Sequence, residues 1–520
     1  MTGNIKRMRT QVLVIGGGAT GTGIARDLAL RGVTCIVAER RDINAGASGA
    51  NHGLLHSGAR YVSGDMTSAA ECRREAELLK KTAPQCIEET GGLFVAVQGD
   101  DEKYVADFPG LCTEAGIPVT AIEPAQALEM EPNLSQRVIA AYRVSDATID
   151  PFRLSLENMA RAQAAGSVLL RNTEVTAFRK KGRRIHAAVL RGRFSGEEMV
   201  VEAEQVISAT GAWAGQVAAL AGAAVEMVYA KGSLLILDTR ITWQVINRLR
   251  PSSNADILVP GGTVSILGTT SEQVDDLDDI RPTLAEVDTI IAEAKAMLPV
   301  LSTSRWLRAY AGVRPLVGSG KNGDSRKLSR GFFLLDHVAD GLDNFITITG
   351  GKLTTFRLMA EKTSDLVCER LGVHTACRTR SEPLPANPDC QWTEPGLAPK
   401  IWLQNKTPRD MLLCECEMVP KSAIDGIVAT LEAAGDQADL RAIGLRSRLG
   451  KGTCQGVFCG VRALAHLYNR DIYTGDEGLA DLRKFLKGRW KGIRPILWGT
   501  PLAQEELQEA LHCGFFSLEL

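Results

Sequence analysis

Residues 12–40 read VLVIGGGATGTGIARDLALRGVTCIVAER: an apolar strand, a glycine-rich turn, an alanine-rich helix and a second apolar strand. Gly16, Gly18 and Gly21 form a G-x-G-x-x-G motif between the first strand and the helix. Such glycines permit a tight turn and a close approach of backbone to a pyrophosphate at the helix N-terminus. Glu39, 23 residues after Gly16, can accept hydrogen bonds from a ribose diol. The segment predicts a dinucleotide site; a glycine turn without a ligand is the weaker interpretation.

Two later segments repeat the strand-and-glycine pattern. ISATGAW (207–213) ends an apolar strand at Gly211, and ITITGGKLTTFRLMA (346–360) runs from a strand through Gly350 and Gly351 into a helix. A domain that binds only a nicotinamide dinucleotide does not need these two further approaches of the backbone. The three segments together favour FAD over NAD.

Composition excludes several classes of protein. The 520 residues are 45% hydrophobic, and 60 basic against 61 acidic residues give a net charge of −1, so we expect no nucleic-acid groove. The N-terminal MTGNIKRMRTQ lacks the apolar core of a signal peptide, and no run of about 18 apolar residues predicts a transmembrane helix. The twelve cysteines are therefore expected to be reduced thiols or ligands in a cytoplasmic protein, attached to a membrane only through partners.

The chain is predicted to divide at a proline-rich segment. Six of its twenty prolines lie between Arg378 and Asp410, and proline disfavours regular helix. Apolar runs such as GSLLILD and VSILGTT, within 225–325, favour an antiparallel sheet inserted into a parallel α/β body. The predicted divisions are a body at 1–375, a linker at 376–410 and a tail at 411–520. Within the body, the predicted nucleotide-binding segments are about 8–60, 145–225 and 326–375, and the predicted substrate segments are about 61–144 and 226–325.

Four cysteines of the tail form two close pairs. Cys414 and Cys416 in MLLCECEMV are followed, after 37 residues, by Cys454 and Cys459 in GTCQGVFCGVR. Four thiolates suit one metal ion or one small cluster, and nearby glycines let backbone amides reach the sulfurs. Zinc is the main alternative to an iron–sulfur cluster, although zinc knuckles usually have C-x₂₋₄-C spacing; free thiols are the third. The other eight are interpreted as packing or incidental thiols: Cys35, Cys72, Cys86, Cys112, Cys368, Cys377, Cys390 and Cys513.

These motifs, with GASGANHGLLHSGARY, GTTS and AYAGVRPLV, resemble the FAD-dependent glycerol-3-phosphate dehydrogenases over essentially the whole chain. With the cysteine tail, the chain is most similar to the large catalytic subunits of the anaerobic, membrane-associated members. The tail resembles the [2Fe–2S] domain of bacterioferritin-associated ferredoxin. The resemblance implies a Rossmann-type FAD-binding domain of the glutathione-reductase and D-amino-acid-oxidase kind, an inserted antiparallel substrate domain and a small, mainly helical domain that holds the cluster.

The same resemblance assigns residues to the cofactor and the substrate. Arg60, Tyr61, Arg314 and Lys352 would bind the phosphate and hydroxyls of glycerol 3-phosphate, with Thr269 assisting, because arginine and lysine suit phosphate in a dry pocket. Ordinary surface cations are the alternative interpretation. The FAD contacts implied are Gly16, Gly18, Ala19, Thr20, Gly21, Glu39, Arg40, Ser48, Val175, Gly211, Gly350, Gly351, Leu353 and Thr354.

The implied reaction moves a hydride from C2 of glycerol 3-phosphate to the flavin and yields dihydroxyacetone phosphate. Electrons would then pass through the cluster to electron-transfer and membrane-anchor subunits and a quinone, at the inner face of the cytoplasmic membrane. His56 is the candidate base because imidazole titrates near neutral pH; a structural histidine is the alternative. Aerobic members have a histidine after KGS, whereas KGSLLIL has Leu234 there, so that role cannot be transferred.

Two other functions stay open. A flavoenzyme of the same fold could oxidise an amine or a 2-hydroxy acid, since fold does not decide substrate. A redox sensor could use the cysteine tail to recruit a partner. The basic segment LRKFLKGRWKGIRPILWG (482–499) is either a docking face for a partner or an anionic membrane, or a solvated helix whose tryptophans pack inside.

Overall fold

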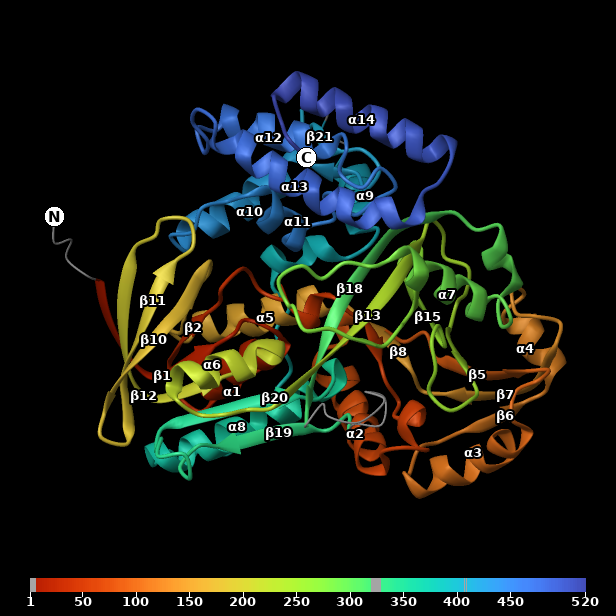
Figure 1. Ribbon diagram of the computed structural model, residues 1–520, viewed down its shortest axis with the longest axis horizontal. Coiled ribbons are helices and arrows are strands. Elements are labelled where there is room, and N and C mark those ends of the chain that lie inside the picture. Colours follow the sequence, from red (N-terminus) through yellow and green to blue (C-terminus); the bar gives the residue numbers. More distant parts are fainter. Residues whose placement is uncertain (1–5, 319–328, 406, 408) are drawn as a thin grey trace.

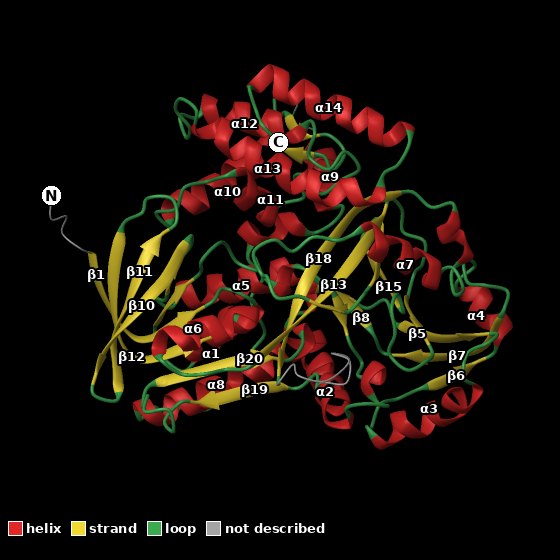
Figure 2. Ribbon diagram, in the orientation of Figure 1, coloured by secondary structure: helices red, strands yellow, loops and turns green. Residues whose placement is uncertain are grey.

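The computed structural model describes residues 6–318, 329–405, 407 and 409–520 (Figure 1). The predicted boundary between residues 325 and 326, and Pro408 of the proline-rich segment, lie outside the described residues. Figure 2 shows two regions that mix strands and helices, side by side, beneath a mainly helical region at the C-terminal end. The predicted α/β class is confirmed.

The first sheet contains the glycine-rich turn. Its central strand β1 (Lys6–Ile15) runs parallel to β2 (Cys35–Ala38) on one side and to β12 (Glu198–Ser208) on the other. β12 in turn pairs in parallel with β20 (Phe345–Gly350). The strands before all three glycine segments therefore end at one edge of the sheet, where α/β folds bind ligands. The same sheet includes β9 (Val168–Leu170), β10 (Thr173–Lys181), β11 (Arg184–Gly192) and β19 (Phe332–Asp336).

Both faces of this sheet are covered, as the continuous apolar run of β1 requires. Val12 and Val14 pack in a core with three helices, and Leu13 and Ile15 pack in the core on the other face. One of these helices, α5, begins at Pro151 and has Asp150 as its N-cap residue. The Asp150 carboxylate accepts the N–H groups of Phe152 and Arg153. The three helices are α1 (Ala19–Leu30), α5 (Pro151–Gln163) and α8 (Phe356–Leu371), and α6 (Ala214–Ala221) lies on the opposite face.

The second sheet combines two segments that are far apart in sequence. β13 (Met227–Leu237) pairs antiparallel with β16 (Val264–Gly268) and along its whole length with β18 (Trp306–Val317). The sheet predicted as antiparallel has one parallel pair, between β14 (Val245–Arg248) and β5 (Gly92–Val97). The parallel pair arises where the two chain segments meet. The remaining strands are β6 (Thr120–Ile122), β7 (Val138–Val144), β15 (Ile257–Gly261) and β17 (Glu272–Gln273).

Short elements surround the second sheet and join it to the first. β3, β8 and β4 form a small three-stranded sheet. Leu54 of β3 packs with Val245 of β14, which attaches this small sheet to the second sheet. The elements are β3 (Leu54–Leu55), β4 (Ile87–Glu88), β8 (Ala147–Ile149), α2 (Met66–Thr82), α3 (Glu102–Glu114), α4 (Pro124–Met130) and α7 (Leu284–Ala294).

The C-terminal helical region has its own apolar core, which includes Ile424, Leu440, Leu464 and Leu482. Its two short strands pair as a hairpin that carries Cys414. No helix among residues 6–318, 329–405, 407 and 409–520 is long and apolar enough to cross a membrane. The elements are α9 (Leu397–Asn405), β21 (Leu412–Cys414), β22 (Val419–Pro420), α10 (Lys421–Ala433), α11 (Leu440–Arg446), α12 (Cys459–Asn469), α13 (Glu477–Ile493) and α14 (Thr500–Phe516).

Buried charges join the C-terminal region to the rest of the chain. The Asp42 carboxylate pairs with Arg446 of α11 at 2.9 Å and with Arg171 at 2.9 Å, which lowers the pKa of this buried carboxyl. On the second sheet, Arg308 of β18 donates to the carbonyl of Gly488 in α13 at 2.9 Å. A Cβ on Gly492 would lie 2.6 Å from Arg308 Nε, so α13 needs glycine where it crosses β18. β18 thus runs from the C-terminal region into the centre of the molecule (Figure 1).

Candidate active site and thiol cluster

The three glycine segments and the second sheet enclose one cavity of about 430 Å³. All six residues predicted to contact substrate line it, although they come from four separate parts of the chain. Most of the predicted cofactor residues line it as well; Gly21 and Thr354 stand behind its wall. The cofactor residues on the wall are Gly16, Gly18, Ala19, Thr20, Glu39, Arg40, Ser48, Val175, Gly211, Gly350, Gly351 and Leu353.

Two glycines of the first turn are required by packing. Gly16 has φ +109°, and a Cβ there would lie 2.5 Å from the carbonyl oxygen of Ala209 after β12. A Cβ on Gly21 would lie 1.9 Å from the carbonyl oxygen of Gly16. The turn can therefore close against α1 only without side chains at these positions. The N–H of Ala19 at the start of α1 donates to Ser48 Oγ at 3.0 Å, which ties the helix N-terminus to the loop after β2.

Glu39 holds the backbone around the turn. One carboxylate oxygen accepts the N–H of Gly17 at 2.7 Å and the other accepts the N–H of Arg41 at 2.7 Å. Burial raises the pKa of this carboxyl, and the two backbone donors oppose that rise. The Arg40 guanidinium lies 4.9 Å from the centre of the Trp213 ring, farther along the same wall. This end of the cavity therefore has an acid beside the glycine turn and a cation stacked on an aromatic ring.

The segment after β20 places a cation beside the start of α8. Gly350 and Gly351 have φ +83° and +69°, and a Cβ on Gly351 would meet Met359 Sδ at 2.5 Å. The reversal of the chain puts Lys352 into the cavity, where its ammonium donates to the carbonyl of Arg330 at 2.7 Å and lies 4.8 Å from the Tyr61 ring centre. Burial lowers the pKa of Lys352, as expected for an ammonium removed from water.

His56 and Tyr61 lie side by side at this cationic end. Tyr61 Oη is 3.2 Å from His56 Nε2, and the N–H of His56 donates to Thr354 Oγ1 at 3.1 Å. Burial, then His52 and the cations Lys352 and Arg60, lower the pKa of His56 well below its ordinary value. Burial raises the pKa of Tyr61. The pair therefore consists of a neutral imidazole and a neutral phenol near neutral pH.

Arg314 of β18 reaches the cavity across β13. Its guanidinium donates to the carbonyl of Thr270 at 3.1 Å and to Thr269 Oγ1. A Cβ on Gly232 would lie 2.6 Å from this guanidinium, so the glycine of KGS is what leaves space for Arg314. Leu234, two residues after this glycine, is buried and also lines the cavity.

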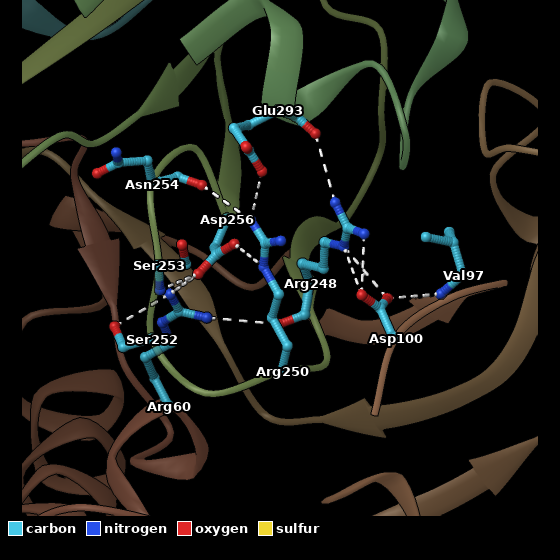
Figure 3. A network of polar contacts seen from close by, with 10 residues as sticks. All are labelled: Arg60, Val97, Asp100, Arg248, Arg250, Ser252, Ser253, Asn254, Asp256 and Glu293. Carbon is cyan, nitrogen blue, oxygen red and sulfur yellow. Dashed lines mark hydrogen bonds and ion pairs between the residues drawn. The ribbon is translucent and has the colours of Figure 1, made fainter. Parts of the chain in front are cut away.

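Arg60 lies in a network of charged side chains around the buried carboxylate of Asp256, shown in Figure 3. Its guanidinium is 2.5 Å from the buried carboxylate of Asp256, and it donates to Ser252 Oγ at 3.2 Å. The other Asp256 oxygen accepts from Arg250 at 2.8 Å, and Arg250 also pairs with Glu293 at 3.0 Å. Arg60 therefore lines the cavity with its charge already balanced by a buried carboxylate.

The four cysteines of the tail come together outside this cavity. Cys414 and Cys416 sulfurs are 3.7 Å apart, Cys416 and Cys454 sulfurs are 3.9 Å apart, and Cys459 contacts both Cys414 and Cys454. Two thiolates bound tetrahedrally to one metal, each at about 2.3 Å, would be about 3.8 Å apart. Cys416 is exposed, whereas Cys414 and Cys459 are buried.

The surrounding backbone also suits thiolate. N–H groups of Glu417 and Gly450 hydrogen-bond Cys414, and those of Gly456 and Phe458 hydrogen-bond Cys454. A Cβ on Gly452 would lie 2.5 Å from the sulfur of Cys416. Yet nowhere in the described part of the chain do three or more His, Cys, Asp or Glu side chains form a complete set of ligands for a metal ion. The four sulfurs instead contact one another in a ring.

A family model of FAD-dependent oxidoreductases matches residues 11–366, the part of the chain that holds the cavity. The chain belongs to this family. The oxidoreductase is 43% identical to the A subunit of the anaerobic glycerol-3-phosphate dehydrogenase of Escherichia coli strain K12, over 98% of this chain and 97% of the relative. It is 39% identical to the A1 subunit of the Haloferax volcanii enzyme of the same name, over 97% of this chain and 90% of the relative.

A solved structure agrees in fold. The glycerol-3-phosphate dehydrogenase of Bacillus halodurans, complexed with FAD, superposes with a TM-score of 0.65 at 20% identity, over 94% of this oxidoreductase and 96% of that chain. At this identity the likeness establishes the fold. The predicted Rossmann-type FAD-binding architecture and the resemblance to the anaerobic catalytic subunits are thus both confirmed.

Two residues that matter to the site of this oxidoreductase were not predicted from the sequence. His52 lies on the cavity wall, its ring centre 6.0 Å from that of His56, and burial lowers its pKa to about 3. It stands four residues before His56 in NHGLLHSGARY, so a second imidazole in the same motif was a usable signal. Asp256 left no such signal, because it meets Arg60 from 196 residues away.

Proposed function

We propose that this oxidoreductase converts sn-glycerol 3-phosphate into dihydroxyacetone phosphate with FAD as the electron acceptor. The main support is a single cavity that joins glycine-rich nucleotide turns to a cationic end, in a chain 43% identical to the A subunit of an anaerobic glycerol-3-phosphate dehydrogenase. A phosphate dianion needs more positive charge than a carboxylate does. Arg314 and Lys352 supply it within one cavity.

The substrate phosphate would be bound by Arg314 and Lys352. Arg314 offers a planar fork that matches phosphate oxygens, and Lys352 adds a compact charge. The Thr269 hydroxyl, already in contact with Arg314, would complete the set. Arg60 would contribute less to phosphate binding, since its guanidinium is already paired with Asp256.

His56 would take the proton of the C2 hydroxyl. Its depressed pKa keeps the imidazole unprotonated near neutral pH, so it can accept a proton, and Tyr61 holds the ring in place through the 3.2 Å contact. The cations Lys352 and Arg314 on the same cavity wall favour loss of this proton because they stabilise the developing alkoxide. Leu234 and the buried walls exclude water from the C2 position.

The C2 hydride carries two electrons, so their export requires carriers of two kinds. FAD held in the cavity would accept both electrons with the hydride, and a [2Fe–2S] cluster held by Cys414, Cys416, Cys454 and Cys459 would carry them onward one at a time. The four thiols, their backbone donors and the glycine against Cys416 fit such a cluster, and zinc is the alternative occupant. Partner electron-transfer and membrane-anchor subunits would pass the electrons to a quinone. The oxidoreductase would then lie at the cytoplasmic face of the membrane.

Anaerobic reduction of the bound flavin tests the substrate. Glycerol 3-phosphate should bleach the oxidised flavin band, whereas glycerol and lactate, which lack the phosphate, should leave it unchanged. Bleaching by a 2-hydroxy acid or an amine, with none by glycerol 3-phosphate, would instead support the alternative of an amine or 2-hydroxy-acid dehydrogenase. A flavin that no substrate reduces would favour the redox sensor.

A further inference from the structure

The last helix, α14, has an apolar stripe on its solvent side. Leu507, Leu511 and Phe515 are 62%, 45% and 79% exposed, and their four-residue spacing places them on one face. The exposed small residues Ala510 and Gly514 lie between them on the same face. The opposite side of α14 does the packing, because His512 is buried and Phe516 contacts the core of the C-terminal region.

One side chain connects this helix to the thiol ring. Arg489 of α13 pairs with Glu505 of α14 at 2.5 Å and donates to the carbonyl of Cys454 at 3.5 Å. Cys416 is exposed, and Phe458, directly before Cys459, is 58% exposed. Arg489 therefore joins the Glu505 end of α14 to the thiol ring, from which electrons of a cluster would leave. α14 itself lies at the outer edge of the molecule, away from both sheets (Figure 1).

The charges around the stripe indicate which kind of molecule could bind there. The α14 sequence TPLAQEELQEALHCGFF contains three glutamates and neither lysine nor arginine. Glu505 and Glu509 neutralise Arg489 and Arg494, and Glu506 is exposed beside Leu507. Glu506 is the acidic side chain outside these pairs, so α14 itself offers an anionic bilayer no basic side chain and one negative charge. A second copy packed about a two-fold axis would bring a second Glu506 to the same stripe, which like charge opposes.

The basic segment before α14 does not change this balance, because most of its charges are engaged within the molecule. Arg483 pairs with Glu519 at 3.4 Å and Lys491 with Asp279 at 3.3 Å, and Lys484 lies 4.7 Å from the Phe194 ring centre. Trp490 is buried and Trp498 is exposed, so only one of the two predicted tryptophans packs inside. The outward apolar surface belongs to α14.

We propose that this stripe is the docking face for the partner subunit that takes electrons from the thiol cluster. The partner would present an apolar groove bordered by lysine or arginine, complementary to an amphipathic helix with acidic edges. The proposal rests on the proposed function, because it names the exit of the same electrons.

The test uses a double variant, Leu507→Asp with Leu511→Asp, in the full-length chain co-produced with the further subunits of the enzyme. Leu284→Asp is the matched control, since Leu284 of α7 is 64% exposed on another surface. Three quantities are compared: flavin content with reduction of a soluble dye by glycerol 3-phosphate, co-purification of the subunits, and reduction of a quinone analogue. In the double variant we expect dye reduction within about twofold of the parent, loss of the subunits, and roughly a tenfold or larger fall in quinone reduction. Phe515→Ser provides a second variant should the first bind flavin poorly.

Three results would overturn the proposal. One is retention of subunits and quinone reduction in the double variant at the level of Leu284→Asp. Another is flotation of the isolated chain with phosphatidylglycerol and phosphatidylethanolamine vesicles that the double variant abolishes, which would make the stripe a lipid-binding face. The third is a dimer of the isolated chain that the double variant converts to monomer. Absence of dye reduction in the parent would contradict the proposed function alone, since co-purification of the subunits still reports on docking.

Discussion

The cavity and the thiol ring use buried charge and exposure in opposite ways. The cavity places Lys352, Arg314 and two neutral histidines inside the molecule, where water is excluded and charge interactions are strong. The thiol ring lies in a small helical region with Cys416 exposed. A substrate must be desolvated before hydride transfer, whereas an electron carrier must approach the surface of a partner. Under the proposed function, the two regions would divide chemistry from electron export.

Both regions contain a glycine at a position where a side chain would collide with a neighbour, but the neighbour differs. At Gly21 a side chain would collide with the backbone of Gly16, which cannot move away. At Gly452 a side chain would collide with the Cys416 side chain, which can rotate. We therefore expect the cavity to tolerate substitution of its glycine less well than the thiol region does. Substitutions that damage one region and leave the other intact test this difference.

The largest expected effect is loss of flavin from Gly21→Val. The added side chain starts 1.9 Å from the Gly16 carbonyl oxygen and should prevent closure of the turn, so the purified protein should contain less than about a tenth of the parent's FAD. Iron bound by the thiol region should remain. Gly110→Ala in α3, where a Cβ meets nothing within 4 Å, is the control and should retain FAD. Full flavin content in Gly21→Val would show that the turn is not the cofactor site.

Cys454→Ser should have the converse effect. Removing one thiol of the ring should abolish the electron paramagnetic resonance signal of a reduced cluster, while glycerol 3-phosphate still bleaches the flavin. Cys513→Ser, in α14 and outside the ring, is the matched control. If both variants keep iron and the signal equally, the ring is not the ligand set. If the parent contains zinc in place of iron, the cluster proposal is wrong.

Arg314→Met should weaken substrate binding more than Arg60→Met. A lost charge-assisted contact costs about 1.5–3 kcal/mol, equivalent to a rise in KM of roughly 10- to 150-fold. Arg60 should matter less to KM and more to thermal stability, because its removal leaves Asp256 with fewer donors. Steady-state dye reduction and thermal unfolding of both variants provide the comparison. A larger KM effect at Arg60 would mean that the substrate displaces Asp256.

The smallest expected effect is a dependence of stability on pH from His56. Its pKa is lowered in the folded state, so the unfolded chain takes up the proton first as the pH falls below about 6.5. This histidine should therefore contribute full stability above about pH 6.5 and lose about 1.4 kcal/mol for each pH unit below it. His56→Gln should reduce the slope of unfolding free energy against pH between about pH 6.5 and 5, while His52, whose pKa is also lowered, keeps its own contribution. Parallel profiles for the two proteins would contradict a buried neutral imidazole.

Local sequence patterns were sufficient for much of both regions. The turn at Gly16 and the close cysteine pairs of the thiol ring depend on residue types at fixed spacing, which a chain displays directly. The parallel pairing of β14 with β5, and the contact of Asp256 with Arg60, depend on tertiary packing between distant segments. The α14 stripe has a regular four-residue spacing, but only the structure reveals that this face is exposed instead of packed.

Anaerobic titration of the full-length protein with glycerol 3-phosphate tests the central claim most directly, with absorbance and electron paramagnetic resonance recorded on the same samples. The account predicts that the flavin band bleaches and that the signal of a reduced [2Fe–2S] cluster grows as substrate is added. A flavin that stays oxidised, or a flavin that bleaches in a protein free of iron, would contradict it.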